Sequence, residues 1–365
     1  MSKLHVGIVF GGVSLEHDIS LQSAKNIACV IDQNRFTIIM IFVDKKGIWH
    51  REDMTNKISF SKIRGVIFDF YQYFKYRLSS SISQCESCVL SRCFSDFEIL
   101  SGLDVVFPII HGGFGEDGSL QGLLKIKKIP FVGSGVLGSA ISMDKDITKR
   151  LLHDAGLMVA PFVTLTESDE QLDFEYYADV FGLPFFVKPA CQGSSIGTSK
   201  VFNRKDFCSA INLAFSLDYK VLIEAAIVGR ELECAVLGNN DLRISVCGEI
   251  LLDKNTFYTY QNKYQECVEI VIPAKISHDV SDKIYSVVLR AFRVLQCWGM
   301  ARVDFFLTSD FRVIINEVNT LPGFAVTSMY PKLWEASGLN SKDLVTILIE
   351  LALESREDDK KRIFS

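Results

Sequence analysis

The chain has 365 residues, more than one hydrophobic core usually supports, which favours two or three domains. Its net charge of −5 at pH 7 gives no basic surplus for a nucleic-acid partner, and no apolar run reaches the ~18 residues of a membrane span. Ten cysteines scattered through a chain that starts without a signal-peptide pattern predict reduced thiols in a cytoplasmic protein.

The N-terminal segment predicts the start of a parallel α/β layer. An apolar run over 4–10 predicts a buried strand, Gly11 and Gly12 a turn, 17–31 a helix, and 38–43 a second strand. Glu16 follows the turn, where it can project into the crevice above the strand ends. Alternatively, it is a first-turn acidic residue that complements the helix dipole.

The following segments complete a first domain, predicted over 1–143. Residues 46–100 are irregular and are interpreted as an elaboration whose fold the sequence does not indicate. The glycine-rich stretch 111–122 follows an apolar run and leads into a helix, with His111 and two carboxylates at the turn. The glycines at 112, 113, 115 and 118 allow the backbone to approach a ligand closely, so we interpret this stretch as a ligand-facing loop. A strand over 129–133 is expected to close the domain.

The central domain is predicted over 144–222 as an α+β unit of mainly antiparallel strands. Asp144 precedes a helix that runs to about residue 155, and a second helix is expected over 204–215. The predicted strands are 160–165, 184–189, 200–202 and 221–226.

The C-terminal domain is predicted over 223–365 and is again α+β. A long helix is expected over 279–296, with further helices from about 327 and 342. A polar, tyrosine-rich loop, 253–266, separates two of the strands. The predicted strands are 232–238, 244–252, 268–272, 301–307 and 312–318.

Lys188 ends a buried strand and is followed by a Gly-Ser-Ser-x-Gly turn over 193–197. A lysine at this place can put a point charge against phosphate oxygens, and the turn can supply backbone N–H and hydroxyl donors to the same anion. The pattern lacks the Walker spacing, so an ordinary P-loop is excluded. The alternative is a surface hairpin without a ligand.

Two short polar motifs, Arg-Val-Asp over 302–304 and Glu-Val-Asn over 317–319, lie at matching places in two predicted neighbouring strands. Alternation puts Arg302 and Asp304 on one face, and likewise Glu317 and Asn319. Two carboxylates and an amide oxygen suit Mg²⁺ bridging nucleotide phosphates, and the arginine would be a fixed cation beside the reacting centre. The alternative is a cross-strand salt-bridge face, which the asparagine among apolar strand residues disfavours.

Three motifs in the same order make the chain resemble the ATP-grasp ligases, specifically the D-alanine–D-alanine ligase family. They are the Gly-Gly-x-Ser-x-Glu-His turn over 11–17, the glycine-rich block 111–122 and the distal block 295–323. The resemblance covers the chain except for about 46–100 and the last ten residues. It implies an ATP-grasp fold with an N-terminal parallel α/β domain, in the α/β class with α+β central and C-terminal parts.

The resemblance also implies roles for individual residues. Glu16 would bind the ammonium group of the first D-alanine, and Ser194 and Tyr264 would complete a hydrogen-bonded set with it. Arg302 and the Gly323 N–H would stabilise the oxyanion. The other implied substrate contacts are His111, Lys263, Ser328 and Met329. The implied ATP contacts are Lys145, Lys188, Glu224, Ala225, Ile227 and Glu231. The implied ligands of two Mg²⁺ ions, which Mn²⁺ could replace, are Asp304, Glu317 and Asn319.

The implied reaction is the ATP-dependent joining of two D-alanines through an acyl phosphate, for peptidoglycan precursor synthesis. Because an acyl phosphate hydrolyses in water, a lid is expected, and loop 253–266 is the candidate. The resemblance also suggests a homodimer. Two alternatives stay open: a D-alanine–D-lactate ligase, against which Tyr264 argues, and a non-catalytic nucleotide-binding protein on the same scaffold. A dinucleotide-dependent oxidoreductase would need GxGxxG after the first strand, which is absent.

Three positions depart from the family pattern. Ala225 stands where many relatives have a lysine, so an adenine contact there would use the backbone alone. Cys191 and Gln192 replace a charged or polar pair before the Gly-Ser-Ser turn. We expect Cys191 to react with thiol reagents if this loop is exposed.

Overall fold

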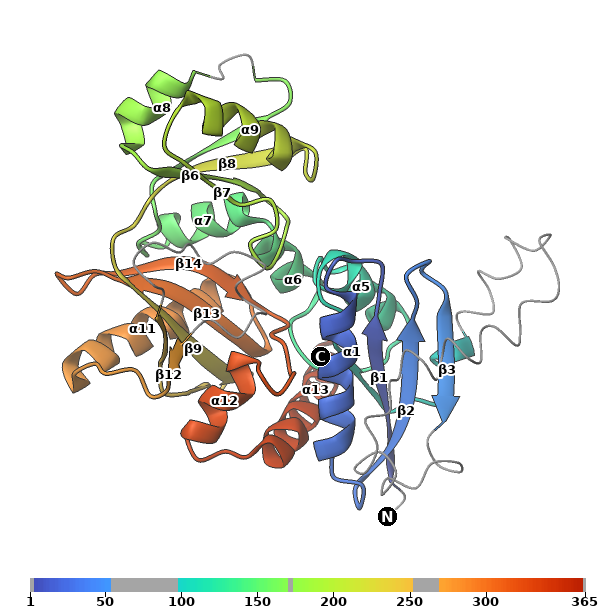
Figure 1. Ribbon diagram of the computed structural model, residues 1–365. Coiled ribbons are helices and arrows are strands. Elements are labelled where there is room, and N and C mark those ends of the chain that lie inside the picture. Colours follow the sequence, from blue (N-terminus) through green and yellow to red (C-terminus); the bar gives the residue numbers. More distant parts are fainter. Residues whose placement is uncertain (1–2, 54–97, 170–172, 252–268, 364–365) are drawn as a thin grey trace, which may run out of the picture. The chain divides into compact units, whose positions relative to one another are not determined.

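The computed structural model describes residues 3–53, 98–169, 173–251 and 269–363 (Figure 1). The chain forms two compact units, one of Met1–Gly133 with Leu321–Ser365 and one of Ser134–Thr320. The predicted three-domain division, with boundaries at 143/144 and 222/223, does not coincide with these units and stays a prediction. None of the helices in the described part of the chain combines the length and apolar character that a membrane crossing requires.

The first unit contains a four-stranded sheet in the order β3-β2-β1-β4. Strand β1 is parallel to β2 and β4, and only the edge strand β3 is antiparallel. Both faces of the parallel strands are buried, which explains their continuous apolar runs. The strands are β1 (Leu4–Gly11), β2 (Phe36–Val43), β3 (Trp49–Asp53) and β4 (Val105–Pro108).

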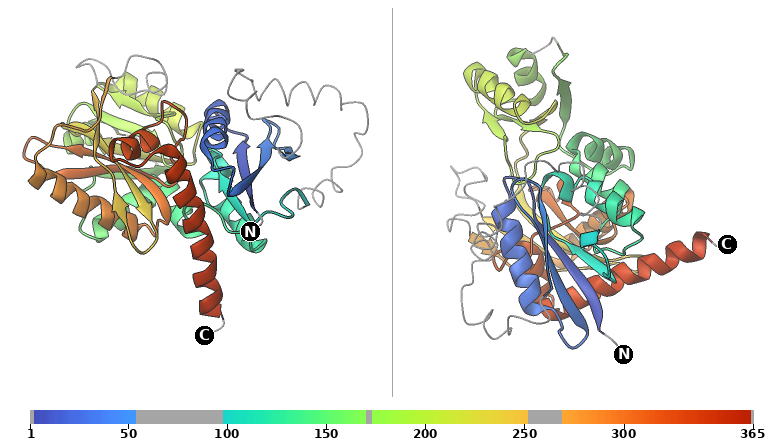
Figure 2. Two further views of the ribbon diagram at one scale, coloured as in Figure 1. Left: turned by 90° about the horizontal axis from the view of Figure 1, so that it is seen from below. Right: turned by 90° about the vertical axis from the view of Figure 1, so that its right-hand side faces the viewer.

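Helices of the first unit pack against this sheet. On one face Leu120 and Leu124 of α5 join a core with Val9 and Val106. Helix α13 contacts both α1 and the edge strand β4 (Figure 2). The helical segments are α1 (His17–Val30), the 3₁₀ turn η1 (Gly113–Gly115), α5 (Ser119–Ile126), α12 (Met329–Ala336) and α13 (Ser341–Ile363).

The second unit begins with two short helices and a four-stranded antiparallel sheet, ordered β5-β8-β6-β7. Helices α8 and α9 cover its apolar face (Figure 1), where Phe185, Val187 and Ile223 are fully buried. The helices are α6 (Val136–Met143), α7 (Lys145–Asp154), α8 (Phe174–Phe181) and α9 (Arg204–Phe215). The strands are β5 (Phe162–Thr166), β6 (Phe185–Pro189), β7 (Ser199–Val201) and β8 (Lys220–Ala225).

A second antiparallel sheet follows in the same unit, ordered β12-β11-β9-β13-β14, with β10 paired to β9. Helix α11 (His278–Val294) covers its apolar face through Ile284, Val288 and Phe292. The strands are β9 (Arg230–Gly238), β10 (Arg243–Ile244), β11 (Gly248–Leu251), β12 (Glu269–Val271), β13 (Gly299–Leu307) and β14 (Val313–Asn319).

Two predicted strands are wrong. In 129–133 only Phe131 pairs, in a single parallel bridge to Val106, because Pro130 has no N–H and the N–H of Ile129 donates to Leu124 of the preceding helix. The predicted strand 244–252 is divided into β10 and β11. At Ser245 the side-chain hydroxyl, and not a backbone carbonyl, accepts the hydrogen bond from the N–H of Ala235 on β9, which interrupts the strand. Helices α6 and α8 and strand β3 were not predicted.

Candidate active site

In the first unit, the predicted substrate residues Glu16 and His111 lie at adjoining turns. Glu16 immediately precedes α1 and is buried, and the Ser14 hydroxyl donates to the carbonyl of His111 over 2.7 Å. Gly112 has φ of +71°, and a Cβ there would lie 3.1 Å from Glu16 Oε2. A side chain at 112 would therefore press on the Glu16 carboxylate, which explains one glycine of this loop.

The C-terminal segment of the same unit adds Gly323 and Ser328 to this cluster. His111 Nε2 lies 3.2 Å from Ser23 Oγ, and that hydroxyl accepts a hydrogen bond from the N–H of Phe324 over 3.1 Å. A Cβ at Gly323 would lie 2.8 Å from Ser328 Oγ and 3.9 Å from His111 Nε2. Met329, the first residue of α12, is buried. The first unit thus brings together five predicted residues: Glu16, His111, Gly323, Ser328 and Met329.

In the second unit, the sheet of β5 to β8 has a charged face opposite its apolar face. Glu224 pairs across the sheet with Phe186 and Phe162, which places the three side chains on one face together with Lys188. Lys188 Nζ donates to Glu224 Oε1 over 2.9 Å, and both side chains are more than nine-tenths buried. Two predicted ATP contacts are therefore in direct contact with each other.

Helix α7 lies on this charged face. Lys149 Nζ of α7 lies 2.8 Å from Glu224 Oε2, so each oxygen of Glu224 faces one ammonium group. Burial alone would raise the pKa of Glu224, but Lys149 and Lys188 hold that pKa below its ordinary value. Glu224 is therefore an ionised, acceptor-only side chain at neutral pH.

The Gly-Ser-Ser turn lies beside the start of α7. The N–H of Lys145 donates to the carbonyl of Ala190, and Lys145 Nζ donates to the carbonyl of Gln192 over 2.5 Å. Ser194 and Ser195 have φ of +51° and +58°. Two successive non-glycine residues in this region carry backbone strain, which is common where a loop binds a ligand.

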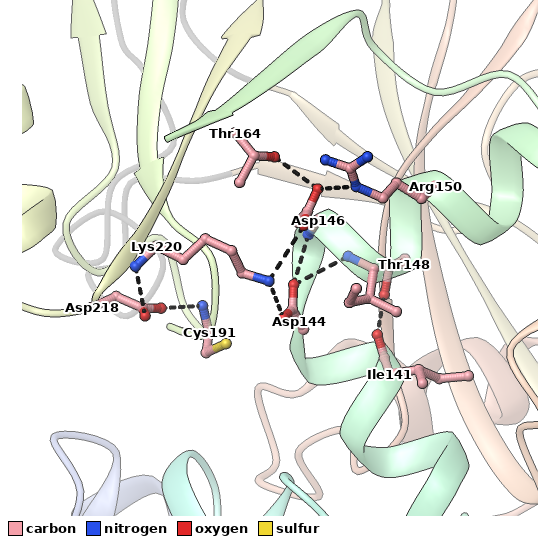
Figure 3. Close-up of polar contacts among 10 residues, drawn as sticks. Ile141, Asp144, Asp146, Thr148, Arg150, Thr164, Cys191, Asp218 and Lys220 are labelled. Carbon is pink, nitrogen blue, oxygen red and sulfur yellow. Dashed lines mark hydrogen bonds and ion pairs between the residues drawn. The ribbon is translucent and has the colours of Figure 1, made fainter. Parts of the chain in front are cut away.

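A polar network fixes α7 to the sheet, and Figure 3 shows Lys220 reaching two of its carboxylates. Asp144 caps α7 by accepting from the N–H groups of residues 146 and 147, and Lys220 Nζ donates to Asp144 and lies 3.4 Å from Asp146. Burial alone would raise the pKa of Asp146, but hydrogen bonds from Thr164 and Arg150 hold it below its ordinary value. The stabilisation from Asp146 is therefore present above pH 3.8 and is lost as the pH falls through the lowered pKa.

We expect Lys220→Met to lower the free energy of unfolding by about 2–4 kcal/mol, because it leaves two largely buried carboxylates without their ammonium partner. Urea unfolding followed by circular dichroism measures this change. Lys205→Met, at an exposed position of α9, is the control and should change the free energy by less than about 0.5 kcal/mol. An equal effect of the two substitutions would contradict the role of the network.

Cys191 is held in the same network, in surroundings that disfavour its reactive thiolate form. Its N–H donates to Asp218 Oδ2 over 2.6 Å, and its side chain is half-buried. Burial, with the nearby carboxylates of Asp218 and Asp144, raises the pKa of the Cys191 thiol to about 12. The thiolate that reacts with alkylating reagents is therefore disfavoured at neutral pH.

The second sheet carries the predicted metal and cation residues on its polar face. Strands β13 and β14 pair Arg302 with Asn319 and Asp304 with Glu317, which confirms that the two motifs lie on neighbouring strands. Arg302 donates two hydrogen bonds of 2.7 Å to Asp304, and its Nε lies 3.0 Å from Glu233 Oε2. Burial alone would lower the pKa of Arg302, but these two carboxylates hold it above its ordinary value. The alternative interpretation, a face of salt bridges between strands, is therefore also correct in part, because Arg302 forms ion pairs with Asp304 and Glu233.

The donor set on this face suits a hard cation. Asp304 and Glu317 supply carboxylate oxygens. The Nδ2 of Asn319 donates to Asp304 Oδ2 over 3.1 Å, so the amide oxygen Oδ1 of Asn319 takes no part in this hydrogen bond. Oxygen ligands of this kind are those that Mg²⁺ takes in proteins. Within residues 3–53, 98–169, 173–251 and 269–363, no three or more His, Cys, Asp or Glu side chains gather as metal ligands, so any ion here depends on the mixed set.

Five other predicted site residues remain, of which three are described by the structure. The N–H of Ala225 donates to the carbonyl of Pro161, so this N–H is not available to a ligand. Ile227 is half-buried in the segment after β8, and Glu231 lies on β9 facing the same side as Glu233. Lys263 and Tyr264, with the whole of the predicted lid loop 253–266, lie outside the described residues, as do three cysteines of the irregular segment 46–100, Cys85, Cys88 and Cys93.

Two buried charged residues of this site, Lys149 and Glu233, were not predicted. Each had a signal in the sequence: Lys149 lies four residues after Lys145 on a helix, and Glu233 lies two residues after Glu231 on a strand. The same periodicity that places the predicted residues on one face also places these two there. A lysine on a helix is usually exposed, however, so spacing alone did not select Lys149.

Comparison with known proteins covers nearly the whole chain. The family model described as D-ala D-ala ligase N-terminus matches residues 5–134, and that described as D-ala D-ala ligase C-terminus matches 151–350. D-alanine–D-alanine ligase A of Escherichia coli (strain K12) is 49% identical over 365 residues, covering 98% of each chain. D-alanine–D-alanine ligase of Shouchella clausii is 50% identical over 364 residues, covering 99% of this chain and 98% of the relative.

Solved structures of similar proteins share the fold. The D-alanine–D-alanine ligase from Coxiella burnetii has a TM-score of 0.81 at 34% identity and covers 100% of this chain and 97% of its own. The VanG D-Ala:D-Ser ligase from Enterococcus faecalis has a TM-score of 0.80 at 32% identity and covers 96% of this chain and 100% of its own. Both structural similarities extend over the whole chain and are not confined to one of its units.

Proposed function

Because the chain belongs to the D-alanine–D-alanine ligase family, we infer that it joins two D-alanines to D-alanyl-D-alanine with ATP, for peptidoglycan synthesis. It is an ATP-dependent ligase with an ATP-grasp fold. The structural observation that best supports this inference is the register that sets Arg302 opposite Asn319 and Asp304 opposite Glu317 on one polar face. A scaffold without catalysis would not need this complete set of cation and oxygen donors.

We assign recognition of D-alanine mainly to the first unit. The Glu16 carboxylate would bind the ammonium group of the first substrate, with His111 near the same molecule. Ser328 and Met329, at the start of α12, would bind the carboxylate of the second. The contacts among Glu16, Gly112, His111 and Gly323 support this assignment, because they hold a carboxylate, an imidazole and a glycine N–H in one cluster.

We assign ATP binding to the second unit. Lys145 and Lys188 would bind phosphate oxygens, Glu224 and the backbone at Ala225 and Ile227 would bind the adenine, and Glu231 would bind the ribose. Asp304, Glu317 and Asn319 would hold two Mg²⁺ ions, for which Mn²⁺ could substitute. Bound there, Mg²⁺ would neutralise phosphate charge that the lysines alone do not balance.

The chemistry needs no covalent nucleophile from the protein. A carboxylate oxygen of the first D-alanine attacks the γ-phosphorus of ATP, the bond to ADP breaks, and an acyl phosphate forms. The neutral amine of the second D-alanine then attacks the acyl carbon, and phosphate leaves. Arg302 and the Gly323 N–H are assigned to the negative oxygen of the tetrahedral intermediate, and positioning supplies much of the remaining catalysis.

An isotope experiment tests this mechanism. When D-alanine labelled with ¹⁸O in its carboxylate is the substrate, we expect each released phosphate to carry one ¹⁸O atom, because the attacking oxygen stays with phosphorus. Mass spectrometry of the phosphate measures the transfer, and unlabelled D-alanine in H₂¹⁸O is the control. Label that enters phosphate only from water would contradict the acyl phosphate and indicate ATP hydrolysis.

Three finer assignments extend the proposal. Ser194, Lys263 and Tyr264 would govern the second substrate, and the D-alanine–D-lactate alternative would require a change in that set. The first unit would form a homodimer. The cytoplasm is the proposed location, since ATP is the substrate and the described cysteines are free thiols.

A further inference from the structure

Lys149 is a buried lysine for which the proposed reaction has no direct use. Its side chain is 1% exposed, and its Nζ lies 2.8 Å from Glu224 Oε2 and 5.7 Å from the centre of the Phe162 ring. Burying an ammonium group costs free energy that one ion pair rarely returns, and an apolar residue of similar volume is often at least as stabilising. The presence of a lysine here therefore points to a need for its charge.

That charge acts on Glu224. Lys188 contacts Oε1 and Lys149 contacts Oε2, so the carboxylate is held from both ends on the charged face of the sheet. Without Lys149, the 3%-exposed carboxylate would keep one ammonium partner and would turn or take up a proton. Lys149 therefore fixes both the orientation of Glu224 and its character as a hydrogen-bond acceptor.

The acceptor character matters for the choice of base. An adenine presents an exocyclic amine, which donates to a carboxylate, whereas a guanine presents a carbonyl oxygen at the equivalent position. An ionised carboxylate has no proton to donate, so it accepts from the first and repels the second. A protonated Glu224 could donate to the guanine carbonyl, and a reoriented Glu224 would no longer accept from the adenine amine, so either change would weaken the discrimination.

We propose that Lys149 is a positioning residue that holds Glu224 as an oriented acceptor, so that the nucleotide site selects adenine over guanine. This inference rests on the proposed contact between Glu224 and the adenine. Lys149 itself contacts neither the base nor the reacting atoms in this assignment; it acts through Glu224. Lys149 lies on α7 one turn after the proposed phosphate contact Lys145, so the same helix carries that contact and the residue that orients Glu224.

The test compares ATP with GTP. Binding of each nucleotide with Mg²⁺ is measured by calorimetry, and ligation by kcat/KM, for the full-length wild type and for Lys149→Met. We expect the wild type to favour ATP by at least about 100-fold and Lys149→Met to reduce this ratio at least about tenfold, chiefly through the KM for ATP. Thermal unfolding checks that the variant is folded at the assay temperature.

Two further variants make the result decisive. Lys149→Gln keeps a donor toward Glu224 without the charge, so it should fold and lose part of the discrimination even if Lys149→Met does not fold. Arg150→Met removes the adjacent, exposed cation of α7 and should leave the ratio unchanged. An unchanged ATP:GTP ratio in a folded Lys149 variant would overturn the inference and leave Lys149 a purely structural residue.

The measurement of nucleotide binding distinguishes a failure of this inference from a failure of the proposed function. If the wild type forms no dipeptide but binds ATP over GTP, and Lys149→Met abolishes that preference, the inference on base selection stands and the proposed reaction fails. If the wild type forms dipeptide and the ratio is the same in Lys149→Met, the proposed reaction stands and the inference fails.

Discussion

Replacing Arg302 by methionine should lower the turnover of D-alanine ligation by about 100–1,000-fold while ATP still binds, because the substitution removes a charged donor from the proposed oxyanion contact. The guanidinium is buried and held by Asp304 and Glu233, so its position is fixed before the reaction starts. Steady-state kinetics gives the turnover, and calorimetry gives the affinity for ATP.

Two variants separate a loss of catalysis from a loss of folding. Arg302→Lys keeps the charge between the two carboxylates but not the two-pronged donor, so it should fold and still lose about tenfold or more in turnover. Arg312→Ala removes a similar pair, with a 2.7 Å contact to Asp310, at an exposed turn of the same strands. It should leave turnover within about twofold. Near-normal turnover in Arg302→Met would refute the oxyanion role.

Replacing Glu317 by glutamine should raise the Mg²⁺ concentration for half-maximal activity by at least about 10–100-fold. The amide keeps the shape of the side chain but removes one negative charge from the proposed ligand set. Activity measured over a Mg²⁺ titration at saturating ATP gives the shift. Glu317 is only partly buried on β14, so the substitution should disturb folding less than a change at Asp304.

The matched control is Glu269→Gln, at an exposed carboxylate of β12 in the same sheet. It should leave the Mg²⁺ requirement unchanged, since the residue belongs to no proposed ligand set. If Glu317→Gln and Glu269→Gln gave the same titration curve as the wild type, the metal assignment on this face would be wrong.

Much of the fold was predictable because the apolar periodicity of its elements is strong. The bounds of the parallel strands β1 and β2 and of the helices α7, α9 and α11 agree with the prediction to within about two residues, and β13 and β14 are neighbouring strands as predicted. Alternation predicted that Arg302 and Asp304 share a face, and likewise Glu317 and Asn319. It does not distinguish their observed pairing from one shifted by two residues, so the register is known only from the structure.

The features that were not predicted depend on contacts that strand alternation and helical periodicity do not indicate. The strand predicted over 129–133 did not form because Pro130 cannot donate to a ladder, and Ser245 interrupted another through its own hydroxyl. Lys149 and Glu233 escaped prediction because a charged residue is taken to be exposed unless its partner is known. Their partners, Glu224 and Arg302, lie 75 and 69 positions away along the chain and become neighbours only in the fold.

The measurement that tests the central claim most directly identifies the product. Purified protein is incubated with ATP, Mg²⁺ and D-alanine, alone and in competition with D-lactate or D-serine, and the products are identified by mass spectrometry. We expect D-alanyl-D-alanine, with one ADP and one phosphate for each dipeptide, as the main product in every mixture. A product that carries D-lactate or D-serine in preference, or ATP turnover without any dipeptide, would contradict the account.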